Sequence, residues 1–342
     1  MEFNVDRMTE QIRELCLIPS PTGYTGTIED HLIVLFEEMG YKPVQTKKGA
    51  IRVCLGGEGN PLLLSAHIDT LGAMVRSIKS NGKLRLTKLG GYPENNIEGE
   101  NCIVHTRDGK AYSGTVQLIH SSTHVYSDIK SMERNDTNVE VVLDECVASK
   151  EDVKKLGISA GDIISLDPRT VVTDSGFIKS RHLDDKASAA VLIELARMVK
   201  ENTVQLNRRV EIFFTNYEEV GHGASAGIPD DITEMIAVDM GCVGDDLETD
   251  ELVVSICAKD SNSPYDYELT TALINVAKEE ELDYAVDIYP FYGSDAGAAL
   301  RAGMDAKFAL IGPGVASSHG YERTHKNGVE NTLKLIIGYA IK

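Results

Sequence analysis

Two patterns of hydrophobic positions alternate along the chain and divide it into three stretches. In residues 1–72, and again from residue 167 onward, unbroken apolar runs alternate with segments whose apolar positions recur at helical spacing. Such runs are typical of strands buried in a parallel sheet, and such segments are typical of helices that cover it. Residues 73–166 instead contain short β-like runs separated by glycine and asparagine turns, which is typical of a small β-barrel or sandwich.

The first stretch predicts two helices followed by two strands. Pro19 and Pro21 end the first helix, because proline lacks the N–H that a helix interior needs. Thr27 is the predicted N-cap of the second helix, and Gly40 is its predicted stop. The four elements span residues 8–16, 28–39, 51–55 and 62–66.

Helices and strands alternate again after the β-rich stretch. The clearest helix spans residues 186–200, where Ala187, Val191 and Leu195 share one stripe. Further helices are predicted over residues 267–279, 295–302 and 329–341, and strands over residues 210–215, 235–238, 252–257 and 306–311. We therefore predict one α/β domain, residues 1–72 and 167–342, with a mostly parallel sheet and helices on both faces. A β domain of residues 73–166 is inserted into it.

Charge and composition exclude several kinds of protein. Lys and Arg number 34 against 53 Asp and Glu, and the net charge of −19 argues against binding to nucleic acid or to an anionic membrane. No apolar run has the ~18 residues that a membrane span needs, and the acidic start of the chain does not resemble a signal peptide. Six scattered cysteines without a CxxC pair predict free thiols in a reducing cytoplasm.

Five polar stretches fall where predicted strands end or where a predicted helix begins. Open α/β sheets build their sites at the carboxyl ends of their strands, so these stretches are expected to converge. An isolated acidic doublet is usually a solvated turn, and an isolated histidine is usually structural, so the set matters more than any member. The stretches contain His67-Ile68-Asp69, Asp184-Asp185, Glu218-Glu219, Asp239 and His325.

These side chains suit a pair of divalent cations. Imidazoles and carboxylates are ligands for borderline ions, and two cations held roughly 3.5–4 Å apart need an anion between them. Within the Glu218-Glu219 doublet, one carboxylate can bind metal while the other acts as a general base. Asp69 is placed to orient the imidazole of His67.

In order and spacing, these stretches resemble the M42 family of metallo-aminopeptidases. This family includes the tetrahedral and glutamyl aminopeptidases, and some members have been labelled cellulase M. The chain is also similar to the wider M18, M20 and M28 dinuclear zinc peptidases. The resemblance extends over nearly the whole chain, including the insert. The matching motifs are Ala66-His67-Ile68-Asp69, Leu183-Asp184-Asp185-Lys186, Tyr217-Glu218-Glu219-Val220-Gly221, Val238-Asp239-Met240-Gly241, Gly293-Ser294-Asp295-Ala296 and Thr324-His325.

The resemblance implies a role for each residue of the set. It implies two divalent metal ions per subunit, with zinc favoured and cobalt or manganese as alternatives. It also implies a cis peptide bond between Asp184 and Asp185. The implied roles are His67 and Asp239 on one metal, Glu219 and His325 on the other, Asp184 as the bridge, Glu218 as general base and Asp69 as the group that orients His67.

The chain departs from the family pattern in two places, and two histidines are candidates for one ligand position. Thr70 stands where many members have glutamate after the His-x-Asp motif, and Arg323 is shifted by one residue. His319 lies close to His325 in sequence and competes with it as a ligand. The resemblance favours His325, because a helix-like segment follows it as in the family.

The expected activity is removal of N-terminal residues from short peptides. A deacylase or carboxypeptidase on the same centre, an endoglucanase and a non-catalytic metal-binding scaffold are the alternatives. The resemblance further implies a large homo-oligomer, often a dodecamer built from dimers. The inserted β domain is expected to serve in assembly or gating.

Overall fold

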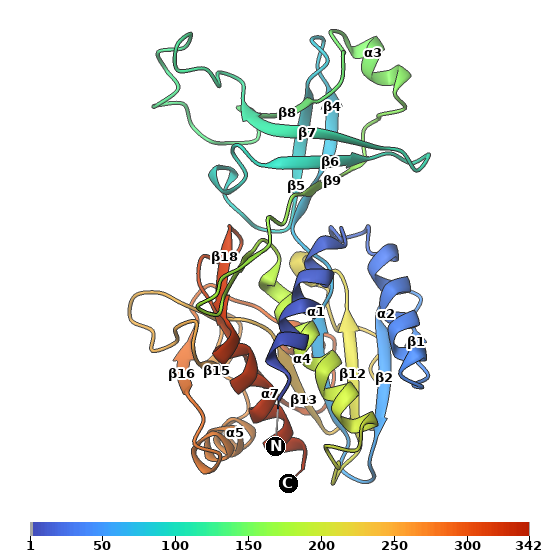
Figure 1. Ribbon diagram of the computed structural model, residues 1–342, viewed down its shortest axis with the longest axis vertical. Helices are drawn as coiled ribbons and strands as arrows, with labels where there is room; N and C mark the ends of the chain where they lie inside the picture. Colours follow the sequence, from blue (N-terminus) through green and yellow to red (C-terminus); the bar gives the residue numbers. More distant parts are fainter. Residues whose placement is uncertain (1–2, 342) are drawn as a thin grey trace. The chain divides into compact units, whose positions relative to one another are not determined.

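The computed structural model describes residues 3–341, which form two compact units (Figure 1). One unit, residues 3–69 and 169–341, is called the catalytic unit after the activity expected from the sequence, and the barrel unit is Thr70–Pro168. The boundaries expected from the sequence, 72/73 and 166/167, differ from these junctions by three and two residues. The predicted fold class, an α/β domain with an inserted β domain, is confirmed. No helix within residues 3–341 combines the length and apolar character needed to cross a membrane.

A mixed β-sheet runs through the catalytic unit. Its strands are β1 (Val44–Gln45), β2 (Ile51–Gly56), β3 (Leu62–His67), β12 (Val210–Thr215), β13 (Glu234–Val238), β14 (Gly241–Cys242), β15 (Val254–Lys259), β16 (Tyr284–Ile288) and β17 (Lys307–Val315). They are ordered β1-β2-β12-β3-β13-β17-β15-β16, and β14 pairs with β17. The neighbours β12, β3, β13 and β17 are parallel, whereas β2 and β15 join them antiparallel.

The central strands are apolar on both faces because helices cover both sides of the sheet. Every residue of β3 and β12 is buried, as the unbroken run Leu62-Leu63-Leu64 predicts. Their parallel register places Thr215 opposite His67, so both strands end at the same edge.

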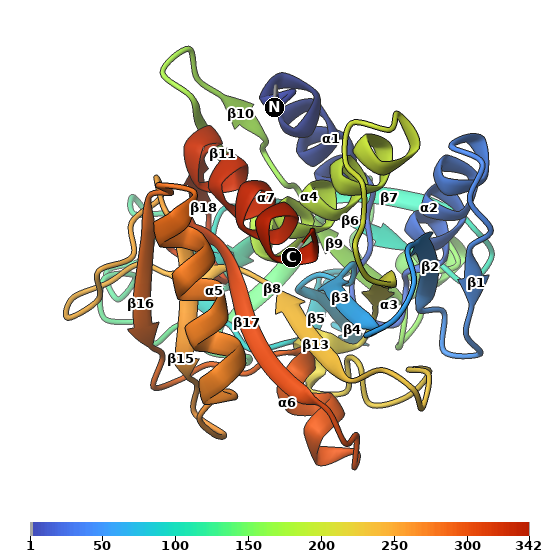
Figure 2. The same ribbon diagram turned by 90° about the horizontal axis from the view of Figure 1, so that it is seen from below.

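Helices pack on each side of this sheet. They are α1 (Val5–Leu17), α2 (Gly26–Glu38), α4 (Leu183–Lys200), α5 (Tyr267–Glu279), α6 (Asp295–Arg301) and α7 (Lys326–Ala340). α4 contacts α1, α7 and β3, and α7 also contacts α5 and β17. α6 contacts β3, β13 and β17, and Figure 2 shows it across the sheet from α7.

The second helix begins earlier than predicted. Its N-cap is Thr25 and not Thr27, because the carbonyl of Thr25 already accepts the N–H of Glu29 at 3.0 Å. The hydroxyl of Thr25 donates to the carboxylate of Glu29 at 2.5 Å. The helix therefore includes Gly26 and Thr27, and it ends before Gly40 as predicted.

A small second sheet was not predicted. It consists of β10 (Val171–Val172), β11 (Phe177–Ser180) and β18 (Glu322–His325), in the order β10-β11-β18. β18 pairs antiparallel with β11 and sets His325 opposite Phe177.

The barrel unit is a closed six-stranded barrel, which decides between the two β architectures expected from the sequence. Its strands are β4 (Gly72–Ile78), β5 (Leu84–Leu89), β6 (Asn101–His105), β7 (Ala111–Leu118), β8 (Val139–Leu143) and β9 (Ile163–Leu166), accompanied by α3 (Lys150–Lys155). The closed order is β4-β5-β8-β7-β6-β9. Closure leaves no unpaired sheet edge.

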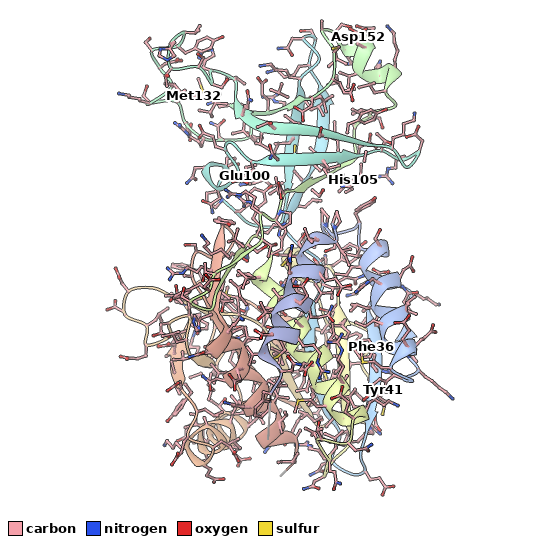
Figure 3. All side chains as sticks on the ribbon, viewed as in Figure 1. Phe36, Tyr41, Glu100, His105, Met132 and Asp152 are labelled. Atoms are coloured by element: carbon pink, nitrogen blue, oxygen red, sulfur yellow. The ribbon has the colours of Figure 1, made fainter. Side chains whose placement is uncertain are left out.

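Each unit buries its own apolar core. In the catalytic unit, the ring of Phe36 lies 5.9 Å from that of Tyr41, and both are labelled in Figure 3. The ring of Phe214 lies 5.5 Å from that of Phe36. In the barrel, Val104 and Val141 belong to a separate buried cluster. Two independent cores are what an inserted domain requires.

Candidate metal centre

Four adjacent parallel strands end in polar side chains at the same edge of the sheet. His67 is the last residue of β3, and Asp239 follows β13. Glu218 and Glu219 lie in a short 3-10 turn, η2 (Glu218–Val220), separated from the end of β12 by two residues. His319 follows β17. The carboxyl edge of this sheet therefore concentrates the groups from which a metal site is built.

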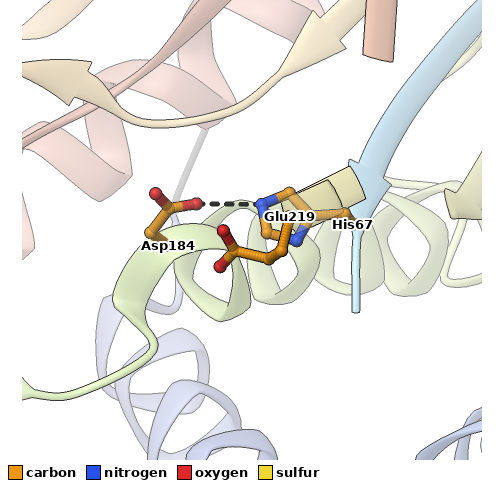
Figure 4. A group of neighbouring side chains, drawn as sticks. All are labelled: His67, Asp184 and Glu219. Atoms are coloured by element: carbon orange, nitrogen blue, oxygen red, sulfur yellow. Dashed lines mark hydrogen bonds and ion pairs between the residues drawn. The ribbon is translucent and has the colours of Figure 1, made fainter. Parts of the chain in front are cut away.

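Asp184 lies between two imidazoles. One oxygen, Oδ1, is 2.9 Å from Nε2 of His67, as Figure 4 shows, and Oδ2 is 3.4 Å from Nε2 of His319. Asp184 and Asp185 have non-helical backbone angles at the start of α4, and the peptide bond between them is cis. The cis bond agrees with the family resemblance. A carboxylate placed in this way offers one oxygen to each side of a two-ion site.

Glu219 and Asp239 complete two groups of possible ligands that share His67. Ligand atoms of His67, Asp184 and Glu219 lie within 4.8 Å of one another, and so do those of His67, Asp185 and Asp239. Oε2 of Glu219 is 3.6 Å from Nε2 of His319, while its buried Oε1 has no hydrogen-bond partner among residues 3–341. An orphaned carboxylate oxygen in this position fits a metal ligand.

The contacts of His67 fit either a protonated ring or a bound metal ion. Its Nδ1 lies 2.9 Å from the backbone carbonyl oxygen of Asp69, which can only accept, so Nδ1 carries a hydrogen. In a neutral imidazole, Nε2 then presents a lone pair, and it lies 2.9 Å from the acceptor Oδ1 of Asp184. Two acceptors at this distance need a proton or a metal ion between them. The residues present therefore fit a cation.

The predicted role of Asp69 takes a different form in the structure. Its backbone carbonyl orients His67, whereas its carboxylate Oδ1 is 3.7 Å from Nδ1. The carboxylate instead accepts the hydroxyl of Thr22 at 2.7 Å and the backbone N–H of Glu218 at 3.1 Å. Asp69 therefore links the histidine to the turn that carries the glutamates.

The cluster holds more negative charge than its imidazoles neutralise. Burial, reinforced by the charge of Asp184, raises the pKa of Asp239 to about 7. Burial also raises the pKa of Glu218 and of Glu219 well above the usual range. Burial alone would lower the pKa of His67, but the hydrogen bond and charge of Asp184 outweigh it and raise that pKa. Bound cations would relieve this repulsion.

His325 does not join the cluster, so this part of the prediction is wrong. Its Nε2 lies 2.9 Å from the carbonyl oxygen of Ser175, and its Nδ1 accepts the N–H of Asn327 at 3.0 Å. The ring packs edge-on against Phe177 with centroids 4.8 Å apart. Pairing of β18 with β11 holds it there, as the N-cap of α7. His319 stands in the cluster instead.

A cavity of about 380 Å³ opens onto the cluster. Asp184, Glu218, Asp239 and His319 line its polar side, and Arg301 is the only lysine or arginine among its lining residues. Such a cavity can admit the end of a peptide next to the proposed ligands.

The two departures from the family pattern lie outside the ligand set. Thr70 is buried in the barrel unit and donates its hydroxyl to the carbonyl oxygen of Leu71 at 3.0 Å. Arg323 lies over the ring of Phe177, 3.8 Å from its centroid, and faces Glu251 at 3.6 Å. Neither residue lines the cavity.

Comparisons with known proteins agree with this geometry. The family model of M42 glutamyl aminopeptidases matches residues 49–335. The chain is 45% identical over 338 residues to YhfE of Bacillus subtilis strain 168, a protein provisionally named an aminopeptidase, and 98% of each chain is covered.

Two solved structures share the fold. The TET1 peptidase of Pyrococcus horikoshii, described as assembling into a tetrahedron or a large octahedral shell, has a TM-score of 0.84 at 23% identity over 98% of this chain and 99% of that one. A TET aminopeptidase from Thaumarchaeota archaeon SCGC AB-539-E09 has a TM-score of 0.88 at 20% identity, covering 99% and 97%.

Proposed function

Because the chain belongs to the M42 peptidase family, we propose that it is a metal-dependent aminopeptidase that removes N-terminal residues from short peptides. Family membership supports the peptidase activity. The observation that carries metal dependence is the position of Asp184, whose two oxygens face the Nε2 atoms of His67 and His319.

The proposed ligands form two sets that share one carboxylate. His67 and Asp239 would bind one ion, Glu219 and His319 would bind the other, and Asp184 would bridge them. Zinc suits this mixture of imidazole and carboxylate best, and cobalt or manganese also fit. When bound, the two ions would polarise the scissile carbonyl and make water more acidic.

Glu218 is the proposed general base. Its carboxylate lines the cavity and is assigned to neither ion, so it remains available to accept a proton. It would take a proton from the attacking water and then deliver that proton to the leaving amine. Asp69 would keep this carboxylate in place by accepting the N–H of Glu218.

A substrate panel tests the activity. The protein, stripped with a chelator and reloaded with each metal in turn, should hydrolyse peptides and anilides that have a free α-amine. It should not hydrolyse N-acylated ones. Preference for N-acylated substrates would indicate a deacylase, and a requirement for a free C-terminus would indicate a carboxypeptidase.

Two further outcomes would contradict an aminopeptidase. Hydrolysis of cellulose that survives the chelator would favour an endoglucanase, because glycosidases commonly use two carboxylates without a metal. One tightly held ion with no hydrolysis of any peptide would favour a scaffold.

We further propose a homo-oligomer, up to a dodecamer built from dimers, to which the barrel unit contributes. The assembly described for the TET1 peptidase of Pyrococcus horikoshii supports this. Light scattering that gave a monomer would contradict it. The six cysteines are free thiols, which supports a reducing compartment such as the cytoplasm.

A further inference from the structure

The loop of residues 216–223 carries both glutamates of the site, and one buried carboxylate holds its two ends together. Asp295, the first residue of α6, accepts the hydroxyl of Thr215 at 2.7 Å and the backbone N–H of Ala224 at 2.9 Å. Thr215 precedes the loop and Ala224 follows it. Because Asp295 is only 3% exposed, these bonds are shielded from water.

Lys48 forms a second bridge across the same loop. Its backbone carbonyl accepts the side-chain amide of Asn216 at 2.6 Å, and its ammonium group donates to the carbonyl of Gly223. Lys48 is half-buried, and burial lowers the pKa of its ammonium group, which the charges of Asp295 and Asp69 oppose only in part. Lys48 and Asp295 therefore hold the same two ends through independent contacts.

The loop packs closely around Asp295. A Cβ atom on Gly223 would lie 2.1 Å from Oδ1 of Asp295 and 3.4 Å from Cγ of Glu218, and the φ of Gly223 is +30°. No side chain fits at this position. The middle of the loop is held as well, since the N–H of Glu218 donates to Asp69.

We propose that Lys48 and Asp295 are positioning residues for the proposed reaction. They close the loop at its base and thereby hold Glu218 and Glu219 in register with the ligands on the neighbouring strands. This inference rests on the proposed role of Glu218. Positioning matters because a displacement of ~1 Å can reduce turnover by about a hundredfold.

Replacing Lys48 with methionine tests this role. Lys48→Met keeps the aliphatic stem and the backbone bond to Asn216 but removes the ammonium group. We expect kcat at saturating metal to fall about tenfold, while KM stays within about twofold, because a misplaced base affects turnover more than substrate binding. Lys48→Arg, which keeps a cationic donor, should recover part of the loss. Lys47→Met is the matched control, because Lys47 is exposed and adjacent, and it should match the wild type.

A double-mutant cycle with Glu218→Gln separates positioning from general stability. If Lys48 acts through Glu218, Lys48→Met should cause little further loss in the Glu218→Gln background. An equal fold-loss in both backgrounds, or an unchanged kcat in the single variant, would overturn the inference. Wild-type turnover by Glu218→Gln would instead refute the proposed base itself.

A second variant covers the case in which Lys48→Met does not fold. Thr215→Val keeps the shape of the side chain but removes the hydroxyl that binds Asp295. It should give the same fall in kcat with little change in KM, and wild-type kinetics would contradict the role of Asp295.

Discussion

Buried carboxylates occur in both units of the molecule, but they are neutralised in different ways. Glu140 of the barrel is 1% exposed and forms ion pairs with Lys79 at 2.5 Å and Lys83 at 2.6 Å. Asp184 and Asp239 of the catalytic unit are also buried, yet no lysine or arginine within residues 3–341 lies within ion-pair distance of either. Within residues 3–341, Glu140 is paired with two lysines, whereas Asp184 faces only the imidazoles of His67 and His319.

The contrast distinguishes Glu140, which has a structural role, from the carboxylates for which we propose a role in metal binding. A buried carboxylate destabilises the fold unless it is paired, and in the barrel two lysines pair with Glu140. In the cluster of the catalytic unit, two imidazoles face several carboxylates and cannot neutralise all of them. We therefore expect bound metal ions to supply the remaining positive charge. Changes at the two places should therefore have different consequences.

The largest difference should appear in turnover. Glu218→Gln should reduce kcat by about 10²- to 10⁴-fold, because the amide cannot accept the proton of the attacking water, while the metal stays bound. Glu140→Gln, the matched change in the barrel, should leave kcat unchanged. Steady-state kinetics with metal analysis measures both, and equal losses would break the distinction between the two carboxylates.

The next largest difference should be between His319 and His325, the two candidate ligands, in metal affinity. His319→Ala should lower metal affinity at least about 10–100-fold. That is the typical cost of losing a group that only supports a ligand, and loss of the ligand itself should cost no less. His325→Ala should bind metal normally but lose about 1 kcal/mol of stability, because His325 is the N-cap of α7. Metal titration and thermal unfolding distinguish them, and the reverse result would restore His325 as the ligand.

The position of His319 shows where sequence reasoning reached its limit. His67 and Asp239 could be placed because each ends an apolar run that has to be a buried strand. The same rule applied to the end of β17 favours His319, since Ser317-Ser318-His319-Gly320 is the first polar stretch after it. The resemblance pointed to His325, and the pairing of β18 with β11 that removes it involves residues far apart in sequence.

Local patterns predicted most of the fold and less of the site. The helices, the parallel strands and the β-rich insert follow from periodicity, because burial of one face fixes the spacing of apolar residues. Contacts such as the carboxylate of Asp69 on the N–H of Glu218 depend on how loops from separate strands meet. No local pattern specifies them.

Metal should stabilise the catalytic unit and leave the barrel unaffected. At a free concentration one hundred times the Kd, a ligand that binds only the folded state adds about 2.7 kcal/mol to the free energy of unfolding. Hydrogen exchange with and without metal should therefore show increased protection around Asp184 and Glu219, with no change around Glu140. Equal protection in both units would mean that the cluster is not the binding site.

The stability of the metal-free protein should depend on pH in an unusual direction. The pKa of Asp239 is raised to about 7 by burial and by Asp184, so the folded state keeps a proton that the unfolded chain loses above about pH 4. The raised pKa of His67 acts in the same direction. Stability should therefore fall as the pH rises from 5.5 to 8, and added metal should remove the trend. Thermal unfolding with a chelator would contradict this if the melting temperature rose over that interval.

The smallest effect should come from the lysines of the barrel. Lys83→Met removes one of two cations from Glu140 while Lys79 remains in place. Because the side chain of Lys83 is about one-third exposed, solvent screens the pair, and the loss should be about 1 kcal/mol. Lys110→Met is the control, since Lys110 pairs with Asp108 at the barrel surface and should matter less. Denaturant unfolding measures both. A change in metal affinity or kcat in Lys83→Met would show that Glu140 is coupled to the catalytic unit, and the distinction between structural and functional acids would fail there.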